Sequence, residues 1–199
     1  MWDHKMIESS LGVFEDTEVS ENYMGRFFIN RDTKPLTAAE KQTIDEFNMI
    51  TSAMAIMIYI AEKDDEMEKE EHDIIIEQMF FQLKQRHKEY DELSEKYGRK
   101  EREIAQKVFD KLMKRYKKEG LHIDQIIKSI NIVFKNNPYS KNFILRLCYY
   151  TALADNCLEQ PEMEAIDKIA AQMHISPSEH ERIKLEVADE LGMDGENLC

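Results

Sequence analysis

Cysteine, glycine and proline are all scarce in this chain of 199 residues, which has 3 Cys, 6 Gly and 4 Pro. The cysteines (Cys148, Cys157 and Cys199) are odd in number and lack CxxC spacing, so the sequence predicts neither a disulfide framework nor a zinc knuckle. With so little glycine and proline, extended disorder is not expected outside the ends. These absences favour one folded domain.

The sequence also lacks a long apolar run. Its longest uncharged stretch, 47–61, is shorter than the roughly 18 to 20 apolar residues that a membrane-spanning helix needs. The first residues do not show the charged-then-apolar pattern of an export signal. We therefore expect a cytoplasmic protein without a transmembrane segment, while peripheral membrane association and the oligomeric state stay open.

Basic residues are fewer than acidic ones, 27 against 40, and the formal net charge is -13. Nucleic-acid binding is not expected, since contacts to phosphate need a cationic surface. The exception is the segment 84–118, which holds 13 basic residues against 7 acidic ones. There Lys107, Lys111, Lys114 and Lys118 share one face of a predicted helix. This face is either simply solvated or a docking surface for an acidic protein partner.

One short acidic pattern occurs twice, as KDDEMEKEE at 63–71 and ADNCLEQPE at 154–162. In each copy an Asp is followed by Asp or Asn and then, further on, by Glu at the fourth and seventh positions after the first Asp. Each copy also follows an apolar segment with helical periodicity. The repeat predicts two similar helical units, each containing an acidic hairpin.

The spacing of apolar residues predicts an all-α fold, a compact bundle of about seven to eight helices built from two pseudo-symmetric halves. Gly98 is expected to break a helix and Ser140 to cap one. The expected helices cover about 37–63, 68–86, 98–120, 123–134, 140–154, 161–173 and 176–192. The expected organisation is an N-terminal arm or short helix (1–36), a helical domain (37–191) made of repeat one (37–86), a basic middle (87–119) and repeat two (121–191), and a frayed tail (192–199).

The acidic hairpins are candidate sites for a divalent cation (Ca²⁺, Mg²⁺ or Zn²⁺), because hard cations take carboxylate oxygens as ligands. The candidate ligands are Asp64, Asp65, Glu68, Glu71, Asp155, Glu159 and Glu162. A simpler interpretation needs no ligand, since acidic residues in a first turn complement the helix dipole and Asp or Asn favours a tight turn. The sequence leaves both interpretations open.

The stretches AEKDDEMEKEEHDII and ALADNCLEQPEMEAIDKIAAQMHISPSEHERI resemble the TerB tellurite-resistance family and the related N-terminal domain of the DjlA membrane co-chaperones. The resemblance covers roughly 37–191 and implies two pseudo-symmetric helical halves with acidic loops associated with cation binding. It implies a stress-response or signalling module without enzymatic activity. The chain departs from the family where Asp65 and Asn156 replace the usual Gly, and it lacks the HPD tripeptide of a J-domain.

No catalytic residues are predicted, because the sequence contains no HExxH, GxSxG, Walker loop or GxGxxG motif. The 12 methionines are expected to fill irregular helix interfaces, or alternatively to line a peptide-binding groove. The predicted function is therefore a non-enzymatic module of this type that binds divalent cations through its hairpins. The alternative is a protein-interaction scaffold that uses a Met-rich groove and the lysine-bearing helix face.

Overall fold

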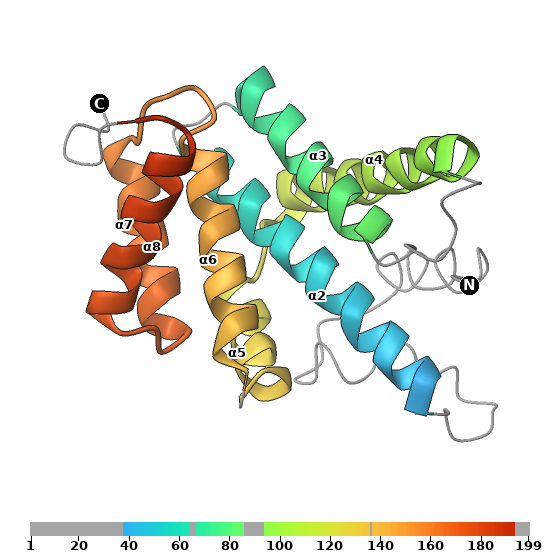
Figure 1. The fold of residues 1–199 in the computed structure, drawn as a ribbon, viewed down its shortest axis with the longest axis horizontal. Coiled ribbons are helices and arrows are strands. Elements are labelled where there is room, and N and C mark those ends of the chain that lie inside the picture. Colours follow the sequence, from blue (N-terminus) through green and yellow to red (C-terminus); the bar gives the residue numbers. More distant parts are fainter. Residues whose placement is uncertain (1–37, 64–66, 86–93, 136, 194–199) are drawn as a thin grey trace.

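The computed structural model describes residues 38–63, 67–85, 94–135 and 137–193, and this part of the chain is all-α (Figure 1). Its helices are α2 (Ala38–Ala61), α3 (Lys69–Gln85), α4 (Ser94–Glu119), α5 (Ile123–Val133), α6 (Pro138–Ala152), α7 (Gln160–Gln172) and α8 (Pro177–Glu190). The predicted fold class is confirmed. The predicted N-terminal arm and the end of the tail lie outside the described residues. Within those residues, no helix has the length and apolar character to cross a membrane.

Helix α2 lies in the interior, where it contacts α3, α4, α5, α6 and α7. Over 49–61 every side chain of α2 is buried except that of Tyr59, which is partly buried, and Met54, Ile56 and Ile58 are at most 1% exposed. A helix that is apolar all round can be stable in water only when neighbours cover all its faces. This burial explains why the segment is uncharged without crossing a membrane.

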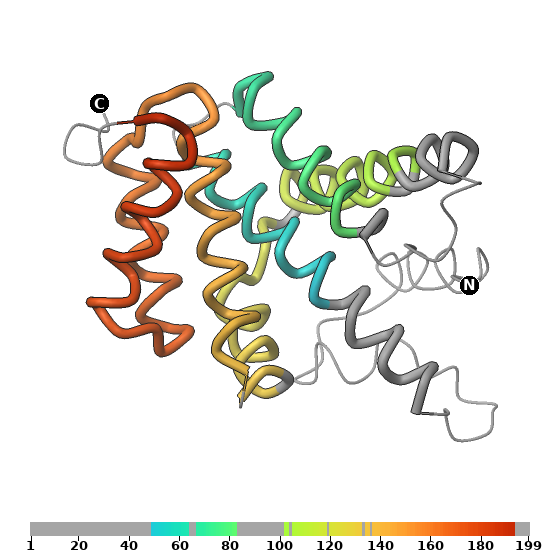
Figure 2. Tube along the Cα trace, in the orientation of Figure 1, coloured from blue at the N-terminus to red at the C-terminus, as the bar shows by residue number. Residues whose placement is uncertain are grey.

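The second apolar helix, α6, packs against α2 on one side and against α7 and α8 on another. Figure 2 shows α6 between α2 and α8 along the trace of the chain. Tyr149, Cys148 and Leu145 on α6 are at most 1% exposed. The helix that precedes each acidic hairpin therefore belongs to the shared core, and α3 and α7 follow the hairpins.

Two local predictions were wrong. Gly98 lies inside α4 and does not break it, because a single glycine costs a helix only about 1 kcal/mol and the flanking residues favour the helix. The N-cap of α6 is Asn137, whose side chain accepts a hydrogen bond from the backbone N–H of Ser140, so Ser140 is inside the first turn. The helix ends predicted near Gly120 and Gly192 are confirmed, and both glycines have positive φ, +75° and +73°.

The methionines of the core leave little free space. Met49, Met54, Met57 and Met79 are buried and line a cavity of about 10 Å³ between α2, α3 and α6. Such a volume holds about one water molecule. These four methionines therefore fill the interior and do not line an open groove.

Candidate functional site

The two acidic hairpins lead into α3 and α7 by the same local structure. The backbone N–H of Glu68 donates to the Glu71 carboxylate at 2.8 Å, and the N–H of Glu159 donates to Glu162 at 3.1 Å. Both acceptors are buried, Glu71 with 6% and Glu162 with 4% of its surface exposed. In this half of a capping box, a carboxylate satisfies a backbone donor that has no partner within the helix. The repeat seen in the sequence therefore corresponds to a repeated structure.

The second hairpin is a tight turn after α6. The Asp155 carboxylate accepts a hydrogen bond from the backbone N–H of Cys157 at 2.9 Å, which stabilises the turn. Asn156 has φ of 72°, the left-handed conformation that Asn tolerates and Gly adopts freely. Leu158 then enters the core with 8% exposure. Asn156 thus adopts the conformation expected where the family pattern has Gly.

The predicted cation ligands are only partly brought together. Glu68, Asp155 and Glu159 are exposed, whereas the two glutamates three residues into α3 and α7 are buried against backbone. Among the described residues, no group of three or more His, Cys, Asp or Glu side chains could hold a metal ion. Asp64 and Asp65 lie outside the described residues, so cation binding at the first hairpin stays a prediction.

The cysteines of the second half differ in state. Burial raises the pKa of the Cys148 thiol to about 12, so this group stays protonated in the core. Cys157, in the second hairpin, is disulfide-bonded. One disulfide does not make a disulfide framework.

The predicted lysine face lies on α4. Lys107, Lys114 and Lys118 are exposed, and Lys111 is partly buried. The opposite side of α4 enters the core through residues that are at most 6% exposed, namely Ala105, Val108, Phe109 and Leu112. The periodicity therefore correctly separated the two faces, because a helix can bury only one apolar stripe against its neighbours.

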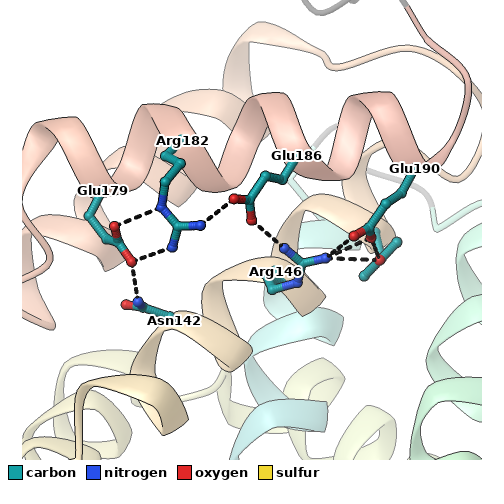
Figure 3. A network of polar contacts seen from close by, with 7 residues as sticks. Asn142, Arg146, Glu179, Arg182, Glu186 and Glu190 are labelled. Carbon is teal, nitrogen blue, oxygen red and sulfur yellow. Dashed lines mark hydrogen bonds and ion pairs between the residues drawn. The ribbon is translucent and has the colours of Figure 1, made fainter.

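A polar network between α6 and α8 was not predicted (Figure 3). Arg146 on α6 donates to Glu186 at 2.9 Å and to Glu190 at 2.6 Å. The Tyr150 hydroxyl also donates to Glu190, and these hydrogen bonds hold the pKa of the Glu190 carboxyl below its ordinary value. The carboxylates recur at helical spacing in the sequence of α8, but nothing in that spacing showed that α6 would supply the cation.

The same network continues along α8. Arg182 pairs with Glu179 at 2.5 Å and also with Glu186, and Glu179 accepts from the Asn142 amide of α6. The hydrogen bonds from Arg182 and Asn142 lower the pKa of Glu179. Linked pairs of this kind fix the packing of two helices more effectively than isolated surface ion pairs do. The network is a structural element of the second half of the protein.

A Tyr–His–Asp arrangement joins α6, α7 and α8. The Tyr149 hydroxyl lies 2.6 Å from Nε2 of His180, whose Nδ1 is 3.8 Å from Asp167. Burial raises the pKa of Tyr149 and lowers that of His180. A nucleophile must reach its substrate, and Tyr149 is only 1% exposed. The arrangement is therefore a polar contact within the core.

These features define a class: an all-α protein in which two apolar helices, α2 and α6, are each followed by a helix whose entry is capped by a buried glutamate. The family model described as "Tellurite resistance protein TerB" matches residues 50–185, which extend from α2 into α8 and make up more than half of the chain. The chain belongs to the TerB family. Neither the curated proteins nor the solved structures contain a match to it.

Proposed function

We propose that this protein is a non-enzymatic module of the TerB family that acts in a stress response or in signalling by binding an acidic protein partner on the lysine face of α4. Three exposed lysines on this face, Lys107, Lys114 and Lys118, support the proposal. They lie within a segment of net positive charge in a chain whose total charge is -13. Charge segregated in this way steers an oppositely charged partner to one face.

The burial of α4 also supports a contact surface that is available in the folded protein. Val108 and Leu112 hold the helix against the core, so binding on the opposite side requires no unfolding. The buried Tyr149–His180 contact supports no nucleophilic role, in agreement with a protein that binds without catalysing a reaction. The partner is expected to present carboxylates or phosphates.

Charge reversal tests the lysine face. Capture of partners from cell extract, with identification by mass spectrometry, would compare the wild-type protein with the double variant Lys107→Glu, Lys114→Glu. We expect the variant to lose partners that the wild type releases as salt rises, because screening weakens exposed charge contacts. The control, Lys69→Glu with Lys184→Glu, reverses as many charges on α3 and α8, away from this face. Equal capture by all three proteins would contradict the proposal.

A second candidate function is divalent-cation binding at the first hairpin. It is favoured by the carboxylate pattern there, in which exposed Glu68 stands at the entrance of α3 above buried Glu71, with Asp64 and Asp65 preceding them in the sequence. Several oxygen ligands from one short segment are typical of Ca²⁺ and Mg²⁺ sites. The second hairpin has fewer carboxylates, so the first is expected to bind more tightly.

Calorimetric titration tests this second candidate. We expect Ca²⁺ or Mg²⁺ to release or absorb heat with the wild-type protein and with Asp155→Asn, and to give none with the double variant Asp64→Asn, Asp65→Asn. Asn keeps the shape of Asp but removes its charge, so loss of heat would point to the carboxylates themselves. Identical heats for all the proteins, or none for any, would remove cation binding at this hairpin.

A further inference from the structure

A large open groove lies where α5 ends, α6 begins and α7 turns into α8. It has a volume of about 1360 Å³, and its lining includes Lys128, Lys135 and Lys141 together with Asn131, Ile132 and Ile175. We call it the basic groove. It is separate from the lysine face of α4 and from both acidic hairpins, and none of the residues predicted to bind a metal or a partner contributes to it.

Side chains set the charge of the basic groove. Helices α5 and α7 end beside it while α6 and α8 begin there, so the charges of the helix ends offset one another. Two carboxylates line the groove, and each is already paired. Asp124 is 3.5 Å from Lys168, and Glu179 is 2.5 Å from Arg182. Neither of these two cations lines the groove.

The lysines of the groove are not compensated in this way. Among the described residues, no ion pair joins Lys128 or Lys135 to a carboxylate, and both side chains are exposed. The Lys141 ammonium donates one hydrogen bond, to the backbone oxygen of Met173 at 3.0 Å, and carries three donors in all. Partial burial lowers the pKa of Lys141, and an anion beside it would favour its charged form.

The basic groove also carries an apolar contact point. Ile132 lines it with 70% of its surface exposed, an uncommon degree of exposure for a large apolar residue on a helix with a buried face. Ile175 is partly buried nearby in the lining, and Ile127, also in the lining, is 2% exposed. The surface thus combines cations with an isoleucine available for contact. Contact with an apolar side chain would remove this isoleucine from water.

We propose that the basic groove binds an acidic peptide segment of a partner protein, with one apolar side chain of that segment seated on Ile132. The peptide is expected to be acidic because its carboxylates would complement the positive charges of Lys128, Lys135 and Lys141, which line the groove. Size argues for a peptide, because pockets for small molecules typically have volumes of about 300–1,000 Å³ and this groove is larger and open. The inference goes beyond the proposed function, and the two can fail separately.

The test is a titration of the ¹⁵N-labelled full chain, followed by heteronuclear NMR. The probe is a short peptide of Glu and Asp around a single Leu. We expect saturable shifts of the backbone amide signals of Lys128, Asn131 and Lys135. The variant Lys128→Glu, Lys135→Glu should bind the peptide at least about tenfold more weakly than the wild type, because it replaces attraction by repulsion. Both side chains are exposed, so circular dichroism should show an unchanged fold.

Two controls separate the sources of binding. The α4 variant Lys107→Glu, Lys114→Glu should bind the probe as the wild type does, and a peptide with Gln and Asn in place of Glu and Asp should not bind. A peptide with Ser in place of Leu should bind more weakly. Equal binding by the groove variant, shifts confined to α4, or groove shifts caused only by anionic lipid vesicles would overturn the proposal.

Discussion

Replacement of Glu162 by alanine is expected to lower the free energy of unfolding by about 1–3 kcal/mol, because it leaves a backbone donor without its acceptor. The Glu162 carboxylate accepts the N–H of Glu159 and is 4% exposed. The same reasoning applies to Glu71→Ala at the first hairpin, where the distance to the N–H of Glu68 is 2.8 Å. Urea denaturation of each variant measures the loss.

The matched control is Glu164→Ala, which removes an exposed carboxylate from the same helix without touching the capping box of Glu159 and Glu162. We expect it to change the stability by less than about 0.5 kcal/mol, as for most surface substitutions. A large loss for both variants would contradict the assignment of Glu162 as the structural group.

A second large effect is expected at Tyr149. Substitution Tyr149→Phe removes the hydroxyl that lies 2.6 Å from Nε2 of His180 and leaves that nitrogen without this partner in a mostly buried position. Loss of one partner of a buried hydrogen bond costs about 1–3 kcal/mol. The measurement is chemical denaturation at neutral pH. A cost within the error of the wild type would show that water or Asp167 readily replaces the hydroxyl.

The same contact predicts how stability depends on pH. Burial lowers the pKa of His180 in the folded protein below its ordinary value of 6.5, although Asp167 acts in the opposite direction. The unfolded chain therefore binds a proton more readily, and this contribution to stability is complete above 6.5 and is lost as the pH falls below that value. In the tautomer whose Nδ1 carries the proton toward Asp167, Nε2 accepts from the Tyr149 hydroxyl, and protonation would remove that acceptor.

The variant His180→Gln serves as the control for this pH effect. Glutamine does not titrate and its amide oxygen can still accept a hydrogen bond. We expect the difference in unfolding free energy between wild type and variant to shift in favour of the variant as the pH falls below 6.5. A difference that stays constant with pH, or that changes in the opposite direction, would contradict a lowered pKa for His180.

The sequence predicted well those features of the fold that depend on the residues of a single helix. Apolar periodicity located the helices, and the uncharged run 47–61 correctly indicated a buried helix. Errors arose at helix boundaries, where local competition matters: Gly98 was absorbed into α4, and Asn137 capped α6 in place of Ser140. At such positions the cost of one residue is about 1 kcal/mol, which the rest of a helix can offset.

The candidate site was predicted only in part. The repeated spacing correctly identified two equivalent helix entries, at α3 and α7, because helix entry imposes the same requirement for a capping acceptor in each copy. The spacing could not show that Glu71 and Glu162 are buried, since burial depends on the neighbouring helices. The basic groove was missed for the same reason: its lysines come from different elements, and no sequence window contains them together with Ile175.

The sequence by itself determined the helical class, the duplication and the separation of α4 into an apolar and a lysine-bearing face, because these depend on interactions between residues a few positions apart. Only the tertiary structure decided which charges are paired. Arg146 meets Glu190, and Lys168 meets Asp124, through the packing of separate helices. Of the two carboxylates that line the basic groove, Asp124 is paired by the packing of α7 against α5, whereas Glu179 is paired with Arg182 within α8.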